Sequence, residues 1–341
     1  MSFHRYLILS LSLFSVAFCS HDFAAKADDS GASAPNLDRR PTDDLPIRER
    51  LYQEGIRGTL VICGGGEIPE DAKQQFAASV DKNKPTLILP TASDKPEAAV
   101  TAASAWLKDL GILEIISPPS ANTDEERIAS LSAEIRRAGS IWICGGQQSR
   151  IADAYVGTDV EVAIGELLDH GGVIGGTSAG AAIMSKQMIA SGKSKPEIRN
   201  GFDLVPDCIV DQHFSQRERL GRLRQAIAQH PAKFGLGIDE ATAVIIKGRN
   251  IDVIGEGFAT IVLANVVGIT LDGQTTGARD EVIQKMPTKS RADLTQLRRS
   301  ARWRASGVDP GEPLNNQRTV PKGSLVIVGG GGMPKEIVDR F

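Results

Sequence analysis

One short motif in the sequence has the composition of a nucleophilic serine site. Gly176-Thr-Ser-Ala-Gly180 places Ser178 among small residues, directly after the apolar run at 172–175. A serine on a sharp strand-to-helix turn needs small neighbours, and the N-terminus of the helix that follows favours an anion beside it. We therefore interpret Ser178 as a nucleophile. The alternative is a small-residue loop in which Ser178 only caps the helix.

A nucleophilic serine requires a base, and few histidines are available. Beyond residue 27 they are His170, His213 and His230. We expect His170 and His230 to end helices, where the helix dipole favours them. His213 instead follows the apolar run at 208–210, at the end of a predicted strand. It is the predicted base, with a buried structural histidine as the alternative.

A third group should orient the imidazole, and N–H donors should stabilise an oxyanion. The run Gly235-Leu-Gly-Ile-Asp-Glu240 offers Glu240, with Asp239 as the alternative. Side chains alternate along a strand, so only one of the two carboxylates can face the site. For the oxyanion we predict the amide of Ala179. A second amide is that of Gly146, because glycine allows close backbone approach.

Arginines gather just after the predicted base. Arg217, Arg219, Arg222 and Arg224 occupy what reads as the first turns of a helix. The helix dipole disfavours cations there, so the cluster needs a reason. Arginine can hold a carboxylate through two hydrogen bonds, which predicts a site for substrate carboxylates. The alternative is a solvated helical face.

A sheet must position these residues. Short apolar runs alternate with helix-like stretches such as 97–110 and 123–138, and the runs lie at 59–63, 86–90, 113–116, 140–144 and 172–175. This alternation predicts an α/β fold with a mostly parallel sheet sandwiched by helices, whose strand ends share one ligand-binding edge. Further short runs, at 241–247, 251–254 and 260–263, predict an antiparallel extension of that sheet.

The start of the chain differs from this α/β region. Residues 1–27 combine a basic start, a short apolar run and Ala25-Lys-Ala27. This pattern predicts a cleaved export signal, with an uncleaved anchor as the alternative. Residues 28–50 are predicted to be a solvated linker, and 51–272 to form the folded domain.

The end of the chain is polar and then repetitive. Residues 273–322 are predicted to be a polar, basic linker or helix, with a helix over 290–304. Residues 323–341 resemble 58–76, a strand followed by a glycine loop. They either add a strand to the sheet or begin a truncated second unit.

Composition narrows the function classes. The 341 residues carry a net charge of −3 and are 41% hydrophobic, an ordinary globular balance that gives no argument for nucleic-acid binding. The cysteines have no metal-ligand spacing, and we expect Cys63 and Cys144 to be buried, inert thiols. We expect no metal and no cofactor.

Taken together, the motifs resemble the cyanophycinases, serine peptidases related to aspartyl dipeptidases. The resemblance covers about residues 55–270 and rests on three segments: Gly176-Thr-Ser-Ala-Gly-Ala181, Asp211-Gln-His-Phe214 with the arginines that follow, and Gly237-Ile-Asp-Glu-Ala-Thr242. It implies a flavodoxin-like fold similar to class I glutamine amidotransferases, with serine replacing their cysteine. It also implies hydrolysis of cyanophycin, multi-L-arginyl-poly-L-aspartate, to β-Asp-Arg dipeptides through an acyl-enzyme.

The resemblance assigns roles residue by residue. Ser178 becomes the nucleophile, His213 the base and Glu240 its partner. The implied substrate pocket consists of Gln148, Asp211, Gln212, Arg217, Arg219 and Arg222. The implied partners are a peptide rich in aspartate and arginine and a second copy in a homodimer. With the export signal, this gives a periplasmic or extracellular enzyme. The alternatives are an aspartyl dipeptidase of the same fold and a non-catalytic binding protein.

Overall fold

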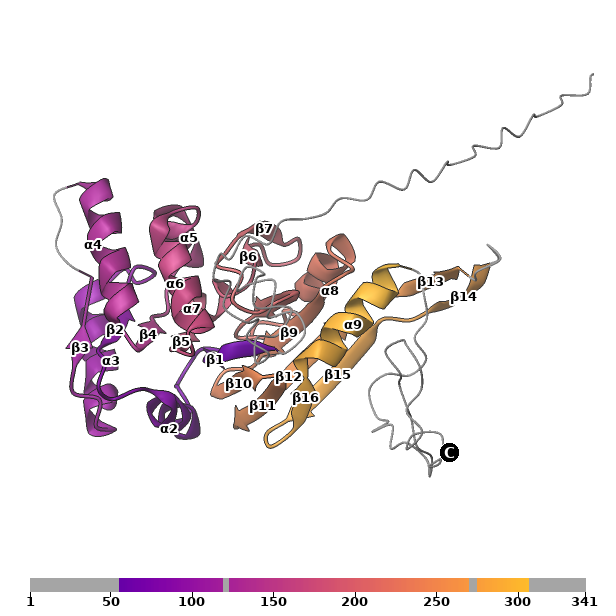
Figure 1. The fold of residues 1–341 in the computed structure, drawn as a ribbon. Coiled ribbons are helices and arrows are strands. Elements are labelled where there is room, and N and C mark those ends of the chain that lie inside the picture. The colour runs from indigo at the N-terminus through magenta and orange to yellow at the C-terminus, as the bar shows by residue number, and fades with distance from the viewer. Residues whose placement is uncertain (1–54, 119–122, 270–274, 307–341) are drawn as a thin grey trace, which may run out of the picture. The chain divides into compact units, whose positions relative to one another are not determined.

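The computed structural model describes residues 55–118, 123–269 and 275–306 (Figure 1). The predicted export signal, the linker at 28–50 and the repeat-like segment at 323–341 lie outside these ranges. Within them, no helix has the length and apolarity needed to span a bilayer.

An eight-stranded sheet forms the first layer of the fold. Its five parallel strands are, in spatial order, β1 (Ile56–Cys63), β5 (Val173–Thr177), β4 (Ser140–Ile143), β2 (Thr86–Leu89) and β3 (Ile115–Ile116). Three antiparallel strands continue the sheet from β1, namely β10 (Thr242–Gly248), β11 (Asn250–Gly255) and β16 (Arg291–Asp293). The fold is therefore α/β with a mostly parallel sheet and an antiparallel extension, as the sequence predicts.

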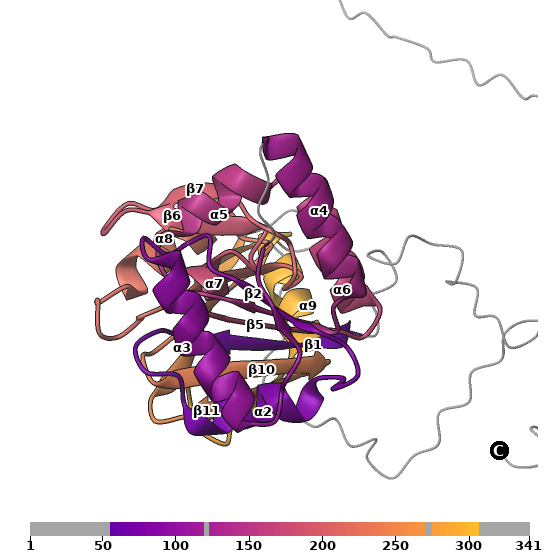
Figure 2. The same ribbon diagram turned by 90° about the vertical axis from the view of Figure 1, so that its left-hand side faces the viewer.

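Helices cover both faces of this sheet (Figure 2). One face carries α2 (Glu70–Ser79) and α3 (Pro96–Asp109), and the other carries α4 (Asp124–Arg137), α5 (Gln148–Tyr155) and α6 (Asp159–Asp169). Alternation along β1 explains the two layers. Leu60 packs toward the α4–α6 side and Val61 toward the α2–α3 side, and both are fully buried.

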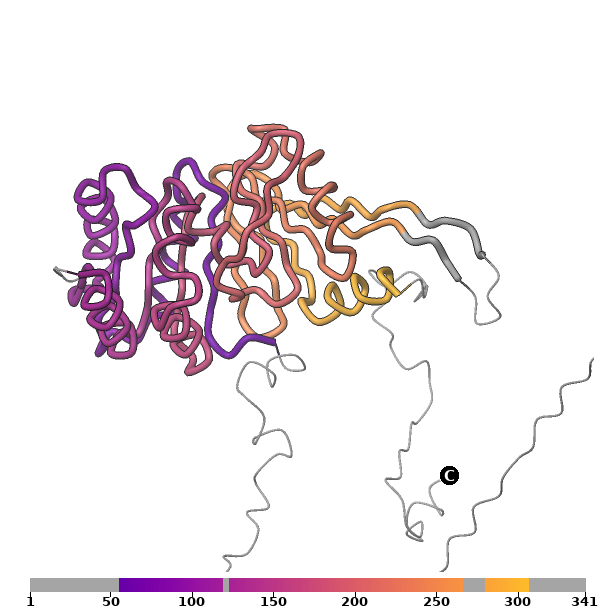
Figure 3. The backbone as a smooth tube through the Cα atoms, turned by 90° about the horizontal axis from the view of Figure 1, so that it is seen from above, coloured from indigo at the N-terminus to yellow at the C-terminus, as the bar shows by residue number. Residues whose placement is uncertain are grey.

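A second, four-stranded sheet lies beside the first. Its strands are β8 (Cys208–Asp211), β9 (Phe234–Ile238), β12 (Phe258–Leu263) and β15 (Val282–Pro287). The two helices that cover it are α8 (Leu220–Gln229) and α9 (Leu294–Ala305), one on each face. Figure 3 shows the chain passing from the indigo and magenta helices on one side to these orange and yellow elements on the other.

The strand expected at 260–263 belongs to this second sheet, which differs from the sequence prediction. It pairs with β9 and β15, whereas β10 and β11 extend the large sheet as predicted. The first residue of β12 is held at the end of β9, because the Phe258 amide donates to the Asp239 carboxylate at 3.1 Å. Strand periodicity alone does not say which sheet a strand joins.

The fold also continues past the boundary expected at residue 272. The described part of 273–322 contains β14 (Thr275–Arg279), β15, β16 and α9. β15 and β16 are edge strands with exposed polar side chains, which is why the sequence reads as a linker. The predicted helix begins at Leu294 instead of residue 290, because Asp293 caps it by accepting from the Gln296 amide at 2.8 Å.

Candidate active site

Ser178 lies on a strained turn between β5 and α7 (Ala179–Ala182). Its backbone has φ 53° and ψ −109°, a conformation that costs energy for a residue with a Cβ. Its amide donates to the Cys63 carbonyl at 3.1 Å, which continues the pairing of β5 with β1. Ser178 occupies the N-cap position of α7, but its hydroxyl makes no capping hydrogen bond, so helix capping does not account for this hydroxyl.

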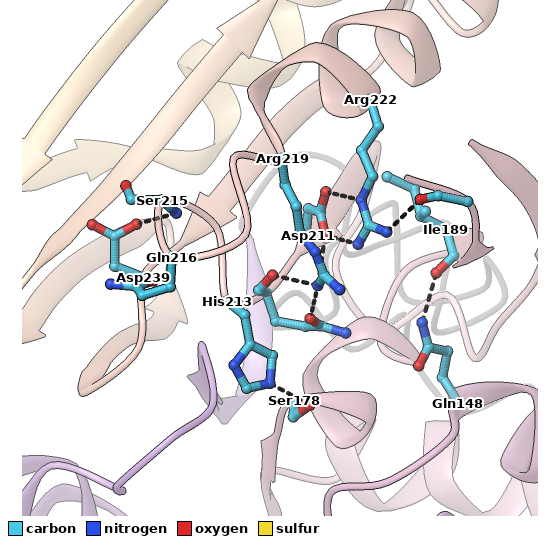
Figure 4. Close-up of polar contacts among 12 residues, drawn as sticks. Gln148, Ser178, Ile189, Asp211, His213, Ser215, Gln216, Arg219, Arg222 and Asp239 are labelled. Atoms are coloured by element: carbon cyan, nitrogen blue, oxygen red, sulfur yellow. Dashed lines mark hydrogen bonds and ion pairs between the residues drawn. The ribbon is translucent and has the colours of Figure 1, made fainter. Parts of the chain in front are cut away.

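The structure brings Ser178, His213 and Glu240 into one chain of hydrogen bonds. Ser178 Oγ lies 2.8 Å from His213 Nε2 (Figure 4), and His213 Nδ1 lies 2.5 Å from Glu240 Oε1. These residues come from the β5–α7 turn, the loop after β8 and the turn between β9 and β10. With Nδ1 donating to the carboxylate, Nε2 is free to accept the serine proton.

Asp239, the alternative partner of the imidazole, points elsewhere. Its carboxylate accepts from the amides of Ser215 at 2.9 Å and Phe258 at 3.1 Å, and the residue is only 3% exposed. It therefore ties the loop after His213 to the start of β12. The neighbouring Glu240 is held by its own amide, which donates to Gln216 Oε1 at 3.0 Å.

The glycine loop after β1 contacts this chain of residues, a role that the sequence analysis did not assign. The Gly64 carbonyl accepts from the His213 amide at 2.6 Å, and the Gly65 carbonyl accepts from the Ala241 amide at 3.1 Å. Gly65 has φ +105°, and a Cβ there would lie 2.4 Å from His213 Nε2. The only signal in the sequence is three consecutive glycines at the end of a strand.

A cavity of about 790 Å³ opens beside Ser178. Most of the predicted pocket residues line it, together with several that were not predicted; the lining consists of Gly146, Gln148, Ser178, Ala190, Ser191, Gly192, Lys193, Gln212, Gln216, Arg217, Glu218, Arg219 and Arg222. Asp211, at 1% exposure, lies behind the arginines. Of the two predicted oxyanion donors, Gly146 lines the cavity and Ala179 is fully buried next to Ser178.

Two of the predicted substrate-binding side chains fasten a neighbouring hairpin, which consists of β6 (Gln187–Ser191) and β7 (Glu197–Asn200). Arg222 donates to both carboxylate oxygens of Asp211, at 2.8 and 2.5 Å, and to the Gly192 carbonyl at 2.8 Å. Gln148 Nε2 donates to the Ile189 carbonyl at 2.9 Å (Figure 4). Both donors are thus engaged with the protein itself.

The other cationic side chains of the cavity differ in whether they already have hydrogen-bond partners within the protein. Arg219 donates to the backbone carbonyl of Gln212 at 2.6 Å and to its side-chain oxygen. Burial lowers the pKa of Arg219 to about 10, so it stays protonated at neutral pH. Within the described ranges, the side chains of Arg217 and Lys193 have no hydrogen-bond or ion-pair partner. Lys193 was not predicted; its only signal is the short basic turn that contains it.

The environment of His213 favours a neutral imidazole. Burial lowers the pKa of His213, the hydrogen bond to Glu240 opposes this effect, and the charges of Arg217 and Arg219 lower the pKa further. A neutral imidazole is the form that can act as a base.

The remaining histidines and the cysteines lie in ordinary structural positions. His170 and His230 occupy the C-caps of α6 and α8, as predicted. Cys63 and Cys144 are buried and free, also as predicted, and burial raises the pKa of each thiol to about 12. These thiols therefore stay protonated and are poor nucleophiles.

Comparison with known proteins agrees with this site. Residues 60–254 match the family model described as peptidase family S51. The chain belongs to peptidase family S51. It is thus a serine-type peptidase of the cyanophycinase-like kind, and both of these predictions are confirmed.

Two curated relatives extend the S51 comparison, and one solved structure is also similar to the chain. The chain is 32% identical to the cyanophycinase of Synechococcus elongatus, over 66% of this chain and 75% of that protein. It is also 32% identical to the cyanophycinase of Geminocystis herdmanii, over 64% of this chain and 85% of that protein. A solved peptidase from an acI-B1 Actinobacterium is 21% identical with a TM-score of 0.49, covering 68% of this chain and 98% of that one.

Proposed function

We propose that this S51 peptidase hydrolyses cyanophycin and releases β-Asp-Arg dipeptides. The observation that carries the proposal is the hydrogen-bonded chain Ser178–His213–Glu240, which opens into a cavity lined by cations. The curated relatives named cyanophycinases support the choice of substrate.

In the proposed reaction, Ser178 is the nucleophile. His213 Nε2 takes the hydroxyl proton while Oγ attacks the carbonyl carbon of an aspartyl peptide bond. The amides of Ala179 and Gly146 would stabilise the oxyanion. Collapse breaks the C–N bond, and the proton on His213 passes to the leaving amine. Water then attacks the acyl-enzyme, gives its proton to His213, and releases the acid and the serine hydroxyl.

The charge of the cavity fits the chemistry of this substrate. Each unit of cyanophycin carries an arginine attached through its α-amine, so its α-carboxylate is free. Arg217 has an unengaged guanidinium beside His213, where it could bind such a carboxylate with two hydrogen bonds. Arg219, which lines the same cavity and stays protonated, adds further positive charge.

Purified protein incubated with cyanophycin tests the proposal, with products identified by mass spectrometry. We expect β-Asp-Arg as the main product. The rate of its release from cyanophycin should exceed the rate at which the enzyme cleaves α-linked aspartyl dipeptides. If the α-linked dipeptides are turned over and cyanophycin is not, the enzyme is an aspartyl dipeptidase. If neither is cleaved, the proposed function is wrong.

The pH dependence of kcat/KM should report the state of His213. Because its pKa is lowered, we expect the acid limb to lie below about pH 6.5, the ordinary value for histidine, with activity falling as pH drops through it. Arg217→Gln removes a cation that disfavours imidazolium, so the limb should move to higher pH. If the acid limb of Arg217→Gln lies at the same pH as in the wild type, or at a lower pH, Arg217 does not lower the pKa of His213.

We further propose that the enzyme acts outside the cytoplasm. The proposal rests on the basic start, apolar run and small-residue site in residues 1–27. N-terminal sequencing of protein recovered from outside the cytoplasm should begin at Asp28. Recovery only from the cytoplasm, with Met1 retained, would contradict export.

A further inference from the structure

Lys193 gives the cavity a cation that the proposed catalytic groups do not use. It is an exposed residue in the turn of the β6–β7 hairpin, and it lines the same cavity as Ser178. Within the described part of the chain its side chain has no ion-pair partner. A lysine in this position is available to a ligand that enters the cavity.

The backbone of the turn that carries Lys193 is held by the residues around it. Gly192 has φ +97°, and a Cβ there would lie 1.9 Å from the Lys195 carbonyl oxygen. Position 192 therefore has no room for a side chain. The hairpin is closed below the turn by Ser191 Oγ, which donates to Glu197 Oε2 at 2.5 Å. These contacts hold the backbone on either side of Lys193, whose exposed side chain is available to a ligand.

A buried ion pair fastens this turn to the active site. Arg222 binds Asp211 on one side and the Gly192 carbonyl, one residue before Lys193, on the other. Both members of the pair are 5% exposed or less, and breaking it would leave an unpaired buried charge. Arg222 thus acts as a positioning residue that connects the end of β8 with the hairpin.

The two unengaged cations come from different elements. Arg217 follows His213 in the chain and is close enough to affect its charge state. Lys193 belongs to the turn of the hairpin and directly follows Gly192, whose carbonyl accepts from Arg222. A cavity of about 790 Å³ is within the size range of pockets that hold drug-sized ligands, and each unit of the proposed substrate brings one carboxylate.

We propose that Lys193 is a specificity-determining residue that binds the arginine carboxylate of the unit next to the one held by Arg217. The inference rests on the proposed function. It predicts that the enzyme recognises two consecutive carboxylates, one on each side of the bond that is cleaved.

Matched two-unit substrates test this inference. One is (β-Asp-Arg)₂ with both arginine carboxylates free, and the other two each carry one arginine as its amide. Lys193→Gln should lower kcat/KM for the free substrate by about threefold to fivefold, the range of an exposed ion pair. One of the two amide substrates lacks the carboxylate that Lys193 is proposed to bind. For that substrate, Lys193→Gln should leave kcat/KM unchanged. Lys193→Arg should restore activity on the free substrate.

Lys195→Gln is the control. It removes the same charge from the same turn, but Lys195 does not line the cavity. Equal losses in both glutamine variants, or equal losses on all three substrates, would mean general electrostatic attraction and would overturn the inference. If the wild type cleaves (β-Asp-Arg)₂ and Lys193→Gln matches it on every substrate, only this inference fails. If the wild type cleaves none of them, the proposed function fails as well.

Discussion

Ser178→Ala should lower kcat/KM for cyanophycin by a factor of about 10⁴ or more, because it removes the hydroxyl that would form the proposed acyl-enzyme. The substitution removes the Ser178 hydroxyl, which lies 2.8 Å from His213 Nε2. It leaves the cavity cations in place, so the affinity for a β-Asp-Arg oligomer, measured by calorimetry, should change little.

Ser194→Ala serves as the matched control, since Ser194 is exposed in the hairpin turn and does not line the cavity. This variant should keep the activity of the wild type. If Ser178→Ala keeps more than about a hundredth of the activity, Ser178 is not the nucleophile.

Gly65→Ala should lower kcat/KM by about 10²- to 10³-fold while the protein remains folded. An alanine Cβ would lie 2.3 Å from His213 Cε1 and 2.4 Å from Nε2, so the imidazole must leave its place. A displacement of about 1 Å in a catalytic group is enough for a loss of this size. The change should appear in kcat more than in KM, because the cations of the cavity are not touched.

A control variant at a second glycine distinguishes the displacement of His213 from the effect of backbone strain. Gly157 has φ +80°, similar in kind to the +105° of Gly65, but a Cβ there meets nothing within 4 Å. Both alanine variants should lose about 1–2 kcal/mol of stability from the left-handed backbone, measured by denaturant unfolding. Only Gly65→Ala should lose activity. Comparable loss of activity in both would show that His213 is not displaced by position 65.

Much of the site could be predicted because its residues carry recognisable local chemistry. Small residues around Ser178 and a histidine at the end of a strand were enough to predict the pair that the structure brings within 2.8 Å. The choice between Asp239 and Glu240 stayed open. Alternation says that they face opposite ways, but the direction depends on Ser215 and Phe258, whose amides hold Asp239.

The parts that could not be predicted depend on contacts between distant segments. Arg222 reads as one more arginine in a basic helix, and only the fold shows that it binds Asp211 and a hairpin carbonyl. In the same way, β12 has the pattern of any short strand, and its pairing with β9 places it in the second sheet. Gly65 is required by the position of an imidazole far along the chain.

The most direct measurement is a crystal structure of the Ser178→Ala variant with a bound β-Asp-Arg oligomer. We expect a substrate carbonyl next to residue 178, with its oxygen within hydrogen-bonding distance of the amides of Ala179 and Gly146 and a carboxylate on Arg217. An oligomer bound away from this cavity, or a His213 ring too far from residue 178 to take a proton from a serine there, would rule out the proposed mechanism.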